Sequence, residues 1–546
     1  MSSYPIKVLH VLANSRPDLN GYAVRTHDLL IAQLDTGKIH PIGITSPFYP
    51  ERESMVDDSQ IDNILYLRCP HPLHHESYNY FGASWLRKRA RLRVKKPHQK
   101  EAILESAVNQ EKLDATKEIK SEQINPDEPQ LETTTMKISS TVFRALRTIR
   151  KLIRSGYRFT RRMIRRILRF GIRIIRKSVR FFRRNIRKIT RPIRKAIRPF
   201  PMWVEERILM RKMEKSIIET VLKNDVEIIH AHTPYRVGIP ALRAAKKLKI
   251  PFVYEMRGMW EDTAVANGRW KTTSLAYRRY RSMETKVLKA ADQVICISKT
   301  LQNEAISRGV KSENIHVVQN AVNPEKIRNE PSNLYVPSTE DKEHLSDTIA
   351  KLNITSKTCV IGYIGSLREL EGVDDTATAV AKLNNEGHDV RLLVLSSALN
   401  QDSLRNHCEK LNLGDLAVIT GPVPHERVPE YYKLIDVFVV SRPDTRVTRL
   451  VTPLKPFEAM VMKRAVICSD LPALAEIIDD GNTGRLYPAG DLEKLAITIL
   501  DLAEDKSERQ RLGNSAKNWV ESERTWMAVT KPIPKLYAKL LDHSGK

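Results

Sequence analysis

The region from Ser441 to Pro488 constrains the fold more than any other part of the chain, because it places a helix signal between two short apolar runs. The first run ends at Val440 and gives way to Ser-Arg-Pro-Asp. The second run covers 465–468 and ends in Ser-Asp, and the helix is predicted to begin near Pro456. A strand, a helix and a second strand form a βαβ unit with parallel strands, and parallel sheets bind ligands beyond the carboxyl ends of their strands. We therefore expect an α/β fold with a ligand site in this region.

The loop between the two runs carries charges that suit a nucleotide diphosphate. Its cations can bind phosphate oxygens, and the N-terminus of the following helix adds the positive end of its dipole. A single carboxylate could accept hydrogen bonds from a ribose. These residues are Arg442, Arg446, Arg449, Lys455 and Glu458. On the residues alone, a solvated basic loop of an α/β protein remains the alternative.

The run Thr-Pro-Leu-Lys-Pro-Phe-Glu-Ala-Met, which ends at Met460, resembles the donor-binding segment of retaining glycosyltransferases of family 4. Those enzymes have the GT-B fold, with two Rossmann-like domains that face each other across a cleft. The resemblance implies that Glu458 holds the donor ribose. Many members carry an earlier Glu, eight residues upstream, where this chain has Leu450. It is similar instead to a subgroup that has a Lys three residues before the Glu, here Lys455.

A second run with many charges, from Tyr254 to Asp262, follows an apolar strand signal in the N-terminal half. It resembles the Tyr-Glu-x-Arg-Gly-x-Trp-Glu-Asp run of family 4 members that build extracellular glycans. The resemblance implies a catalytic group of His232, Glu255 and Arg257. It also implies that the acceptor side includes Trp260, Glu261 and Asp262.

Two further loops resemble parts of the family's donor site. The loop after the first predicted strand, at 6–13, brings Gly21 and Tyr22 to the position that lies against the donor phosphates. In the loop from 365 to 372, most members have an Arg and a Lys that clamp the diphosphate, and this chain has Ser366 and Glu371 there. We expect Arg368 to take over, together with Arg442 and Lys455.

The motifs together predict the arrangement of the domains. We expect an N-terminal Rossmann-like acceptor domain at 1–325 that contains an insertion at 86–204. A linker at 326–357 then leads to a nucleotide-sugar domain at 358–520. The helix at 521–546 is expected to cross back to the first domain, as in the family.

The insertion holds nearly all of the excess positive charge. Residues 141–200 contain 23 Lys and Arg and no Asp or Glu, so the other residues share only +4 of the formal charge of +27. Apolar residues recur there at helical spacing, which predicts basic amphipathic helices. Such helices suit an anionic membrane surface. A nucleic-acid site or a coiled-coil arm is a less favoured alternative, because the apolar stripe is continuous and acidic partners are absent.

The five cysteines are scattered and never form a CxxC pair, which favours a reduced compartment without a zinc site or disulfides. We expect a cytoplasmic protein that is peripheral on the inner face of the membrane. The family resemblance implies no cofactor and no essential metal.

These inferences converge on one function. We expect transfer of a sugar from a nucleotide-sugar donor to a glycan or lipid-linked acceptor at the membrane surface, with retention of configuration. The alternatives are a catalytically weak GT-B scaffold and a nucleotide-sugar epimerase, each with the same basic arm.

Overall fold

The computed structural model describes residues 5–18, 20–48, 58–71, 199–328 and 338–543. The chain forms one unit from 1–84 together with 209–546, and a second unit from 85–208. The predicted basic helices at 141–200 lie outside the described residues, apart from the last two positions. No helix in the described ranges has both the length and the apolar character that a membrane span requires.

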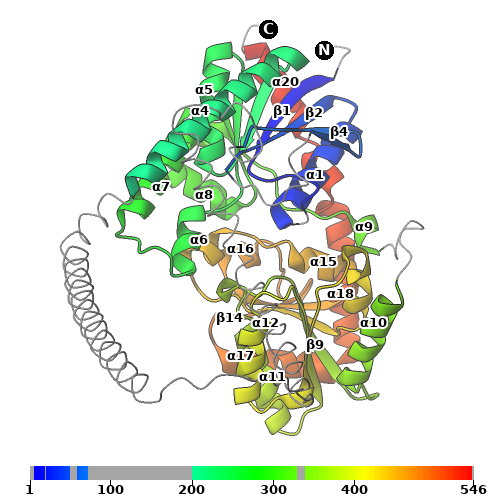
Figure 1. The fold of residues 1–546 in the computed structure, drawn as a ribbon. Coiled ribbons are helices and arrows are strands. Elements are labelled where there is room, and N and C mark those ends of the chain that lie inside the picture. Colours follow the sequence, from blue (N-terminus) through cyan, green and yellow to red (C-terminus); the bar gives the residue numbers. More distant parts are fainter. Residues whose placement is uncertain (1–4, 19, 49–57, 72–198, 329–337, 544–546) are drawn as a thin grey trace, which may run out of the picture. The chain divides into compact units, whose positions relative to one another are not determined.

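The first sheet has eight strands in the order β3-β4-β2-β1-β5-β6-β7-β8. Figure 1 labels three of them, β1, β2 and β4. Every neighbouring pair is parallel except β3 and β4. The direction of strand succession changes between β1 and β5, where ligands bind in open α/β sheets. The strands are β1 (Ile6–Leu12), β2 (Ile39–Thr45), β3 (Ser59–Ile61), β4 (Ile64–Arg68), β5 (Ile228–His232), β6 (Phe252–Met256), β7 (Gln293–Cys296) and β8 (Ile315–Val317).

The helices of this half follow the strands in βα order. Helix α1 begins directly after the loop that leaves β1, where the side chain of Asn20 accepts hydrogen bonds from the backbone N–H groups of Tyr22 and Ala23. Helix α5 packs against β1, β5 and β6. The helices are α1 (Gly21–Asp35), α4 (Pro199–Asn224), α5 (Tyr235–Leu248), α6 (Trp260–Ala266), α7 (Leu275–Ala290), α8 (Lys299–Ser307) and α9 (Pro324–Arg328).

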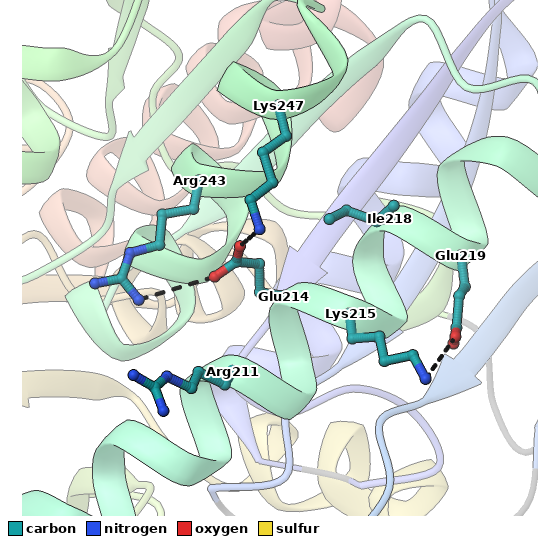
Figure 2. A pocket seen from close by; sticks show the side chains of 7 residues that line it. All are labelled: Arg211, Glu214, Lys215, Ile218, Glu219, Arg243 and Lys247. Carbon is teal, nitrogen blue, oxygen red and sulfur yellow. Dashed lines mark ion pairs between the residues drawn. The ribbon is translucent and has the colours of Figure 1, made fainter.

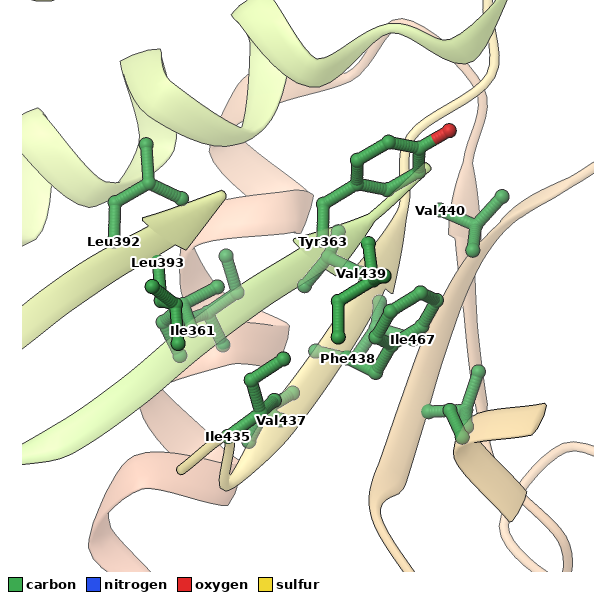
Figure 3. Packing of buried hydrophobic residues seen from close by; sticks show 14 of the residues in the cluster. Ile361, Tyr363, Leu392, Leu393, Ile435, Val437, Phe438, Val439, Val440 and Ile467 are labelled. Carbon is green, nitrogen blue, oxygen red and sulfur yellow. The ribbon is translucent and has the colours of Figure 1, made fainter. Parts of the chain in front are cut away.

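The second sheet is wholly parallel and has six strands in the order β11-β10-β9-β12-β13-β14. Its central strands β9 and β12 are fully buried, and Figure 3 shows how Tyr363, Phe438 and Ile467 pack with their neighbours. The predicted βαβ unit is confirmed as β12, α15 and β13. The strands are β9 (Cys359–Ile364), β10 (Val390–Leu395), β11 (Ala417–Thr420), β12 (Val437–Val440), β13 (Ala465–Asp470) and β14 (Arg485–Pro488).

Helices also accompany the second sheet, and one of them, α10, lies in the segment that the sequence analysis assigns to a linker. The domain boundaries themselves stay predictions. The helices are α10 (Thr339–Leu352), α11 (Val373–Asn385), α12 (Gln401–Lys410), α13 (Val428–Lys433), α14 (Arg446–Leu450), α15 (Lys455–Val461), α16 (Pro472–Ala475), α17 (Leu492–Glu504) and α18 (Lys506–Glu523).

The last two helices, α19 (Trp526–Thr530) and α20 (Ile533–His543), belong to the core of the first sheet. Tyr537 is fully buried there, in one cluster with Val8 of β1 and Ile228 of β5. The end of the described chain therefore completes a core that the first strand begins.

Candidate functional site

The loops that follow β9 and β12 meet at the carboxyl edge of the second sheet. Gly372 has φ +67°, and a Cβ atom added to it would lie 1.7 Å from the backbone oxygen of Ser441. The Ser441 hydroxyl in turn donates to the backbone oxygen of Gly372 at 2.5 Å. Only glycine fits this close approach with a positive φ. The contact brings 365–372 and the loop after β12 together.

Glu371 occupies the position where the family has a lysine, and it binds two of the predicted donor-site arginines. Its Oε2 accepts from Arg442 at 2.8 Å, and its Oε1 accepts from Arg368 at 2.7 Å. Burial by itself would raise the pKa of Glu371, but Arg442 and Arg368 outweigh burial and lower it. Arg442 is 7% exposed and Arg368 is 49% exposed, so only Arg368 can turn readily toward a ligand.

Lys455 and Glu458, the predicted donor-site pair, lie on one face of α15. Lys455 Nζ is 2.9 Å from Glu458 Oε2, and the Tyr432 hydroxyl donates to the same oxygen at 2.9 Å. The side chains of Lys455 and Glu458 are 34% and 18% exposed. A ligand can therefore reach both groups while Tyr432 fixes the carboxylate.

The other two cations of this loop also have carboxylate partners. Arg446 donates to Glu304 at 2.6 Å and lies 3.5 Å from Asp262. Arg449 donates to Asp444 at 2.6 Å. All four cations of the predicted basic loop are thus paired in this state, and a diphosphate has to compete with carboxylates for them.

Glu255 is the centre of the predicted catalytic group at the end of β6. Its Oε1 accepts from Arg25 at 2.7 Å and from Arg257 at 3.0 Å. Burial would raise the pKa of Glu255, but Arg257 and Arg25 hold it well below its ordinary value. The carboxylate is therefore ionised, and it fixes the orientation of both guanidinium groups.

Two histidines lie next to the other oxygen of Glu255, and a third histidine, His10, contacts one of them. His232 Nδ1 and His230 Nε2 lie 3.2 and 3.4 Å from Glu255 Oε2. His232 Nε2 is 2.9 Å from His10 Nδ1, so both of its ring nitrogens face protein groups. All three rings are fully buried, which lowers their pKa values and keeps them neutral at pH 7. The place of His232 is inside the core, and its catalytic assignment stays a prediction.

Two more residues complete this histidine cluster. The Gln33 side-chain oxygen lies 2.9 Å from His10 Nε2, and the Tyr537 hydroxyl lies 2.7 Å from His230 Nδ1. Because Tyr537 belongs to α20, the C-terminal helix takes part in the surroundings of Glu255. Sequence reasoning missed His10, Gln33 and Tyr537, since no local motif carries them.

The histidines also form the group that is best suited to hold a metal ion among the described residues. Ligand atoms of His10, His230 and His232 lie within 4.8 Å of one another. Two histidine nitrogens on one zinc ion lie about 3.3 Å apart. At 2.9 Å the nitrogens of His10 and His232 instead share a hydrogen bond. This arrangement does not fit a metal ion, and the absence of an essential metal remains an expectation.

Gly21 and Tyr22 form the first turn of α1. Nothing lies within 4 Å of a Cβ atom added to Gly21, so the space above this residue is open. The Tyr22 hydroxyl donates to the backbone oxygen of Thr233 at 3.1 Å, and the Arg257 guanidinium lies 4.8 Å from the Tyr22 ring centroid. Burial raises the pKa of Tyr22 to about 12. Tyr22 therefore supports Arg257 as a neutral phenol.

The predicted acceptor-side residues lie at the start of α6. Glu261 is fully buried and binds Arg308 at 2.8 Å. Asp262 is 3% exposed and accepts from the Tyr277 hydroxyl at 3.0 Å. Trp260 is partly exposed. The two acids thus hold α6 in place, and Trp260 is the member of the trio that an acceptor can reach.

A chain of hydrogen bonds runs from Glu255 to the loop before α15. Arg25 Nε donates to the Asn320 side-chain oxygen at 2.7 Å. Asn320 Nδ2 donates to the backbone oxygen of Thr452 at 3.0 Å, three residues before Lys455. Neither Arg25 nor Asn320 belongs to a motif that the sequence analysis used. The link joins the two groups of candidate site residues within one unit of the chain.

The arrangement of two parallel α/β sheets, with polar groups at the carboxyl edges of both, matches a known fold. The sucrose-phosphate synthase of Thermosynechococcus elongatus superposes with a TM-score of 0.60 at 14% identity, over 99% of this chain and 100% of that chain. The fold class is GT-B, as the sequence analysis expects.

Two family descriptions match the chain. "Glycosyltransferase Family 4" matches residues 158–326, and "Glycosyl transferases group 1" matches residues 346–519. Together the two ranges span more than half of the chain. The protein is a glycosyltransferase with a family 4 domain followed by a group 1 domain.

Two relatives show distant similarity to this chain. The capsular polysaccharide biosynthesis glycosyltransferase of Staphylococcus aureus is 22% identical over 339 residues, which are 60% of this chain and 82% of that protein. The alpha-monoglucosyldiacylglycerol synthase of Streptococcus pneumoniae is 24% identical over 328 residues, which are 59% of this chain and 70% of that protein.

Proposed function

We propose that the protein transfers a sugar from a nucleotide-sugar donor to a glycan or lipid-linked acceptor, with retention of configuration, at the cytoplasmic face of a membrane. The observation that carries the proposal is the pair of Lys455 and Glu458. It combines a reachable cation and a reachable carboxylate, 2.9 Å apart, in the first turn of α15, the helix before β13. A diphosphate and a ribose require this combination.

The donor diphosphate would engage the cations that are partly exposed. Lys455 and Arg368 can leave their carboxylate partners for phosphate oxygens, because their side chains are 34% and 49% exposed. Negative charge grows on the leaving diphosphate as the sugar becomes oxocarbenium-like, so cations held there stabilise the transition state. Arg442 stays on Glu371 and fixes the loop that carries Arg368. Glu458, still held by Tyr432, accepts from the ribose.

The group around Glu255 would serve the reacting sugar through Arg257. Glu255 is 1% exposed, so it acts as a positioning residue for the guanidinium, which is also supported by the Tyr22 ring. His232 stabilises the second carboxylate oxygen from inside the core. In this proposal Trp260 offers a partly exposed ring for an acceptor sugar, since aromatic faces bury apolar area well.

The acceptor class rests on the relatives and on the basic segment. The names of the two relatives refer to a capsular polysaccharide and to a glycosylated diacylglycerol. The 23 cations at 141–200 suit an anionic leaflet, where lipid-linked acceptors are found. Both observations favour a product that is assembled at the membrane.

The test is a panel of nucleotide sugars with lipid extracts as acceptors, read as nucleotide release and as the anomeric configuration of the product by NMR. We expect release with at least one donor and an anomeric centre that matches the donor. The single variants Lys455→Ala and Glu458→Ala should each reduce transfer. Nucleotide release that is unchanged in both variants would refute the donor-site assignment. A product with inverted anomeric configuration would refute the proposed retention.

Membrane action is tested separately by sedimentation of the full chain with anionic vesicles. We expect binding at moderate salt, and release of a variant that lacks 141–198 while its nucleotide-sugar hydrolysis persists. A deletion variant that sediments as well as the full chain would exclude this segment as the anchor.

A non-catalytic GT-B scaffold is the second candidate, because Glu371 takes up two arginines that a diphosphate would use. It predicts nucleotide binding without turnover. An absence of both transfer and hydrolysis across the donor panel, in protein that binds nucleotide by calorimetry, would favour the scaffold.

A further inference from the structure

Residues of α4 and α5 line a groove (Figure 2), and none of the candidate site residues is among them. Its volume is about 620 Å³. Four cations and two carboxylates line it, with one apolar side chain among them. The lining residues are Arg211, Glu214, Lys215, Ile218, Glu219, Arg243 and Lys247.

The positive charges of the groove face outward, whereas one of its two carboxylates is largely covered. Glu214 is 10% exposed and lies 2.5 Å from Lys247 and 3.8 Å from Arg243. Dashed lines in Figure 2 mark both ion pairs. Those two cations are 64% and 51% exposed, and Lys215 is 76% exposed. Glu214 thus anchors the cations of α5 and contributes little negative charge to the surface.

Apolar side chains accompany these cations on the same helix. Ile218 lies in the groove, and Leu222, one turn further along α4, is 66% exposed. A helix that presents Lys and Arg beside exposed apolar residues suits the interface of an anionic membrane. Nucleic acid would use the cations but would leave the exposed leucine in water. Charge and apolar exposure together therefore favour lipid.

We propose that the α4–α5 groove is a membrane-contact surface of the folded body. Its cations bind the phosphate-bearing headgroups of anionic lipids, and Leu222 enters the boundary between headgroups and acyl chains. The proposal rests on the membrane action in the proposed function and adds a contact that orients the enzyme. Helix α4 begins at Pro199, where the basic segment of 141–200 ends, so the helix that carries the groove directly follows the basic segment in the chain.

The first test places a probe on the proposed surface of the full chain. The new cysteine of Leu222→Cys is labelled with an environment-sensitive nitrobenzoxadiazole dye. The labelling is selective for position 222 because all five native cysteines are buried. We expect the emission to rise with vesicles of phosphatidylcholine and phosphatidylglycerol, and nitroxide-bearing lipids to quench it. The matched control is Ile354→Cys, at an apolar residue that is 45% exposed on the loop before β9, and its emission should not change. A vesicle-bound protein whose label at 222 stays in water would overturn the proposal and leave the anchor at 141–200 intact.

The second test removes two cations that line the groove, Arg211 and Lys215, and also Lys246, an exposed residue of α5 that does not line the groove. The partners of Glu214 are left in place. In Arg211→Gln/Lys215→Gln/Lys246→Gln, the vesicle concentration for half of the emission change at 222 should rise by up to about a hundredfold, since each cation near the lipid is worth about fivefold. The control neutralises three exposed lysines in the part of the chain that contains the second sheet, Lys357, Lys410 and Lys494. This change should leave the vesicle concentration for half of the emission change at 222 unaltered.

The remaining outcomes also decide between explanations. Equal losses in the two triple variants would mean that only net charge matters, which overturns a local surface. Failure of the full chain to bind vesicles at all overturns both the groove and the membrane part of the proposed function. Binding of duplex DNA that the groove variant loses, with no response to vesicles, would assign the groove to nucleic acid.

Discussion

Replacing Glu255 by Gln should test how strongly one buried carboxylate organises the N-terminal half. Arg25 and Arg257 are 5% and 8% exposed, and both donate to Glu255. Removing one partner of a buried ion pair costs about 3–5 kcal/mol. A typical domain has a free energy of unfolding of about 5–15 kcal/mol. Glu255→Gln should therefore lower the midpoint of urea unfolding strongly.

Glu458→Gln is the matched control, because its partner Lys455 is 34% exposed and an exposed pair contributes at most about 1 kcal/mol. Urea unfolding of wild type and both variants, monitored by circular dichroism, gives the change in free energy of unfolding for each variant. A loss below about 1 kcal/mol for Glu255→Gln would refute the idea that the carboxylate neutralises two buried cations.

The difference in free energy of unfolding between wild type and Glu255→Gln should also depend on pH, which provides an independent check. The folded protein holds the pKa of Glu255 well below the ordinary value of 4.5, so the unfolded chain binds a proton there first as the pH falls. The contribution of Glu255 to stability is fully present above the ordinary pKa and is lost on acidification. The gap between wild type and Glu255→Gln should stay constant near neutrality and narrow below pH 4.5. A gap that widens in acid would contradict this.

The other predictions concern single contacts. Lys455→Ala and Glu458→Ala should each reduce transfer by at least about tenfold and leave unfolding nearly unchanged, by kinetics and denaturation. Gly372→Ala should destabilise the fold by about 1–3 kcal/mol, since the added Cβ meets a backbone oxygen at 1.7 Å. Gly21→Ala meets nothing within 4 Å, so it should fold normally and weaken only nucleotide binding by calorimetry. Tyr537→Phe should cost about 1 kcal/mol in urea unfolding through one lost hydrogen bond.

The first strand and the strands on either side of α15 could be predicted from the sequence, because parallel strands that are buried on both faces are continuous apolar runs. The βαβ unit around α15 and the run that begins at Tyr254 were found in this way. The chemistry at the strand ends was only partly predictable. From the sequence, Glu371 is only the residue that replaces a lysine of the family. In the structure, its carboxylate binds and orients Arg368 and Arg442.

His232 and Arg257 were predicted to lie with Glu255, whereas Arg25 and Tyr537 were not, because they come from distant parts of the chain. Arg25 is 230 residues away, and the Tyr537 hydroxyl that reaches His230 is 307 residues from that ring. Neither belongs to a motif with fixed spacing. Local patterns identify which residues carry chemistry, but the pairs that neutralise buried charge appear only once the topology is known.

The position of α20 has a consequence for how the protein is made. The core of the first sheet joins Val8 and Ile228 to Trp526, Ile533 and Tyr537. Val8 and Ile228 are synthesised long before Trp526, Ile533 and Tyr537. The apolar face of the first sheet therefore stays uncovered while the second sheet is synthesised. During that interval the nascent chain is most prone to aggregation and most in need of chaperones. A message cut short before α19 would yield a protein with an intact second sheet and a first sheet that is never closed.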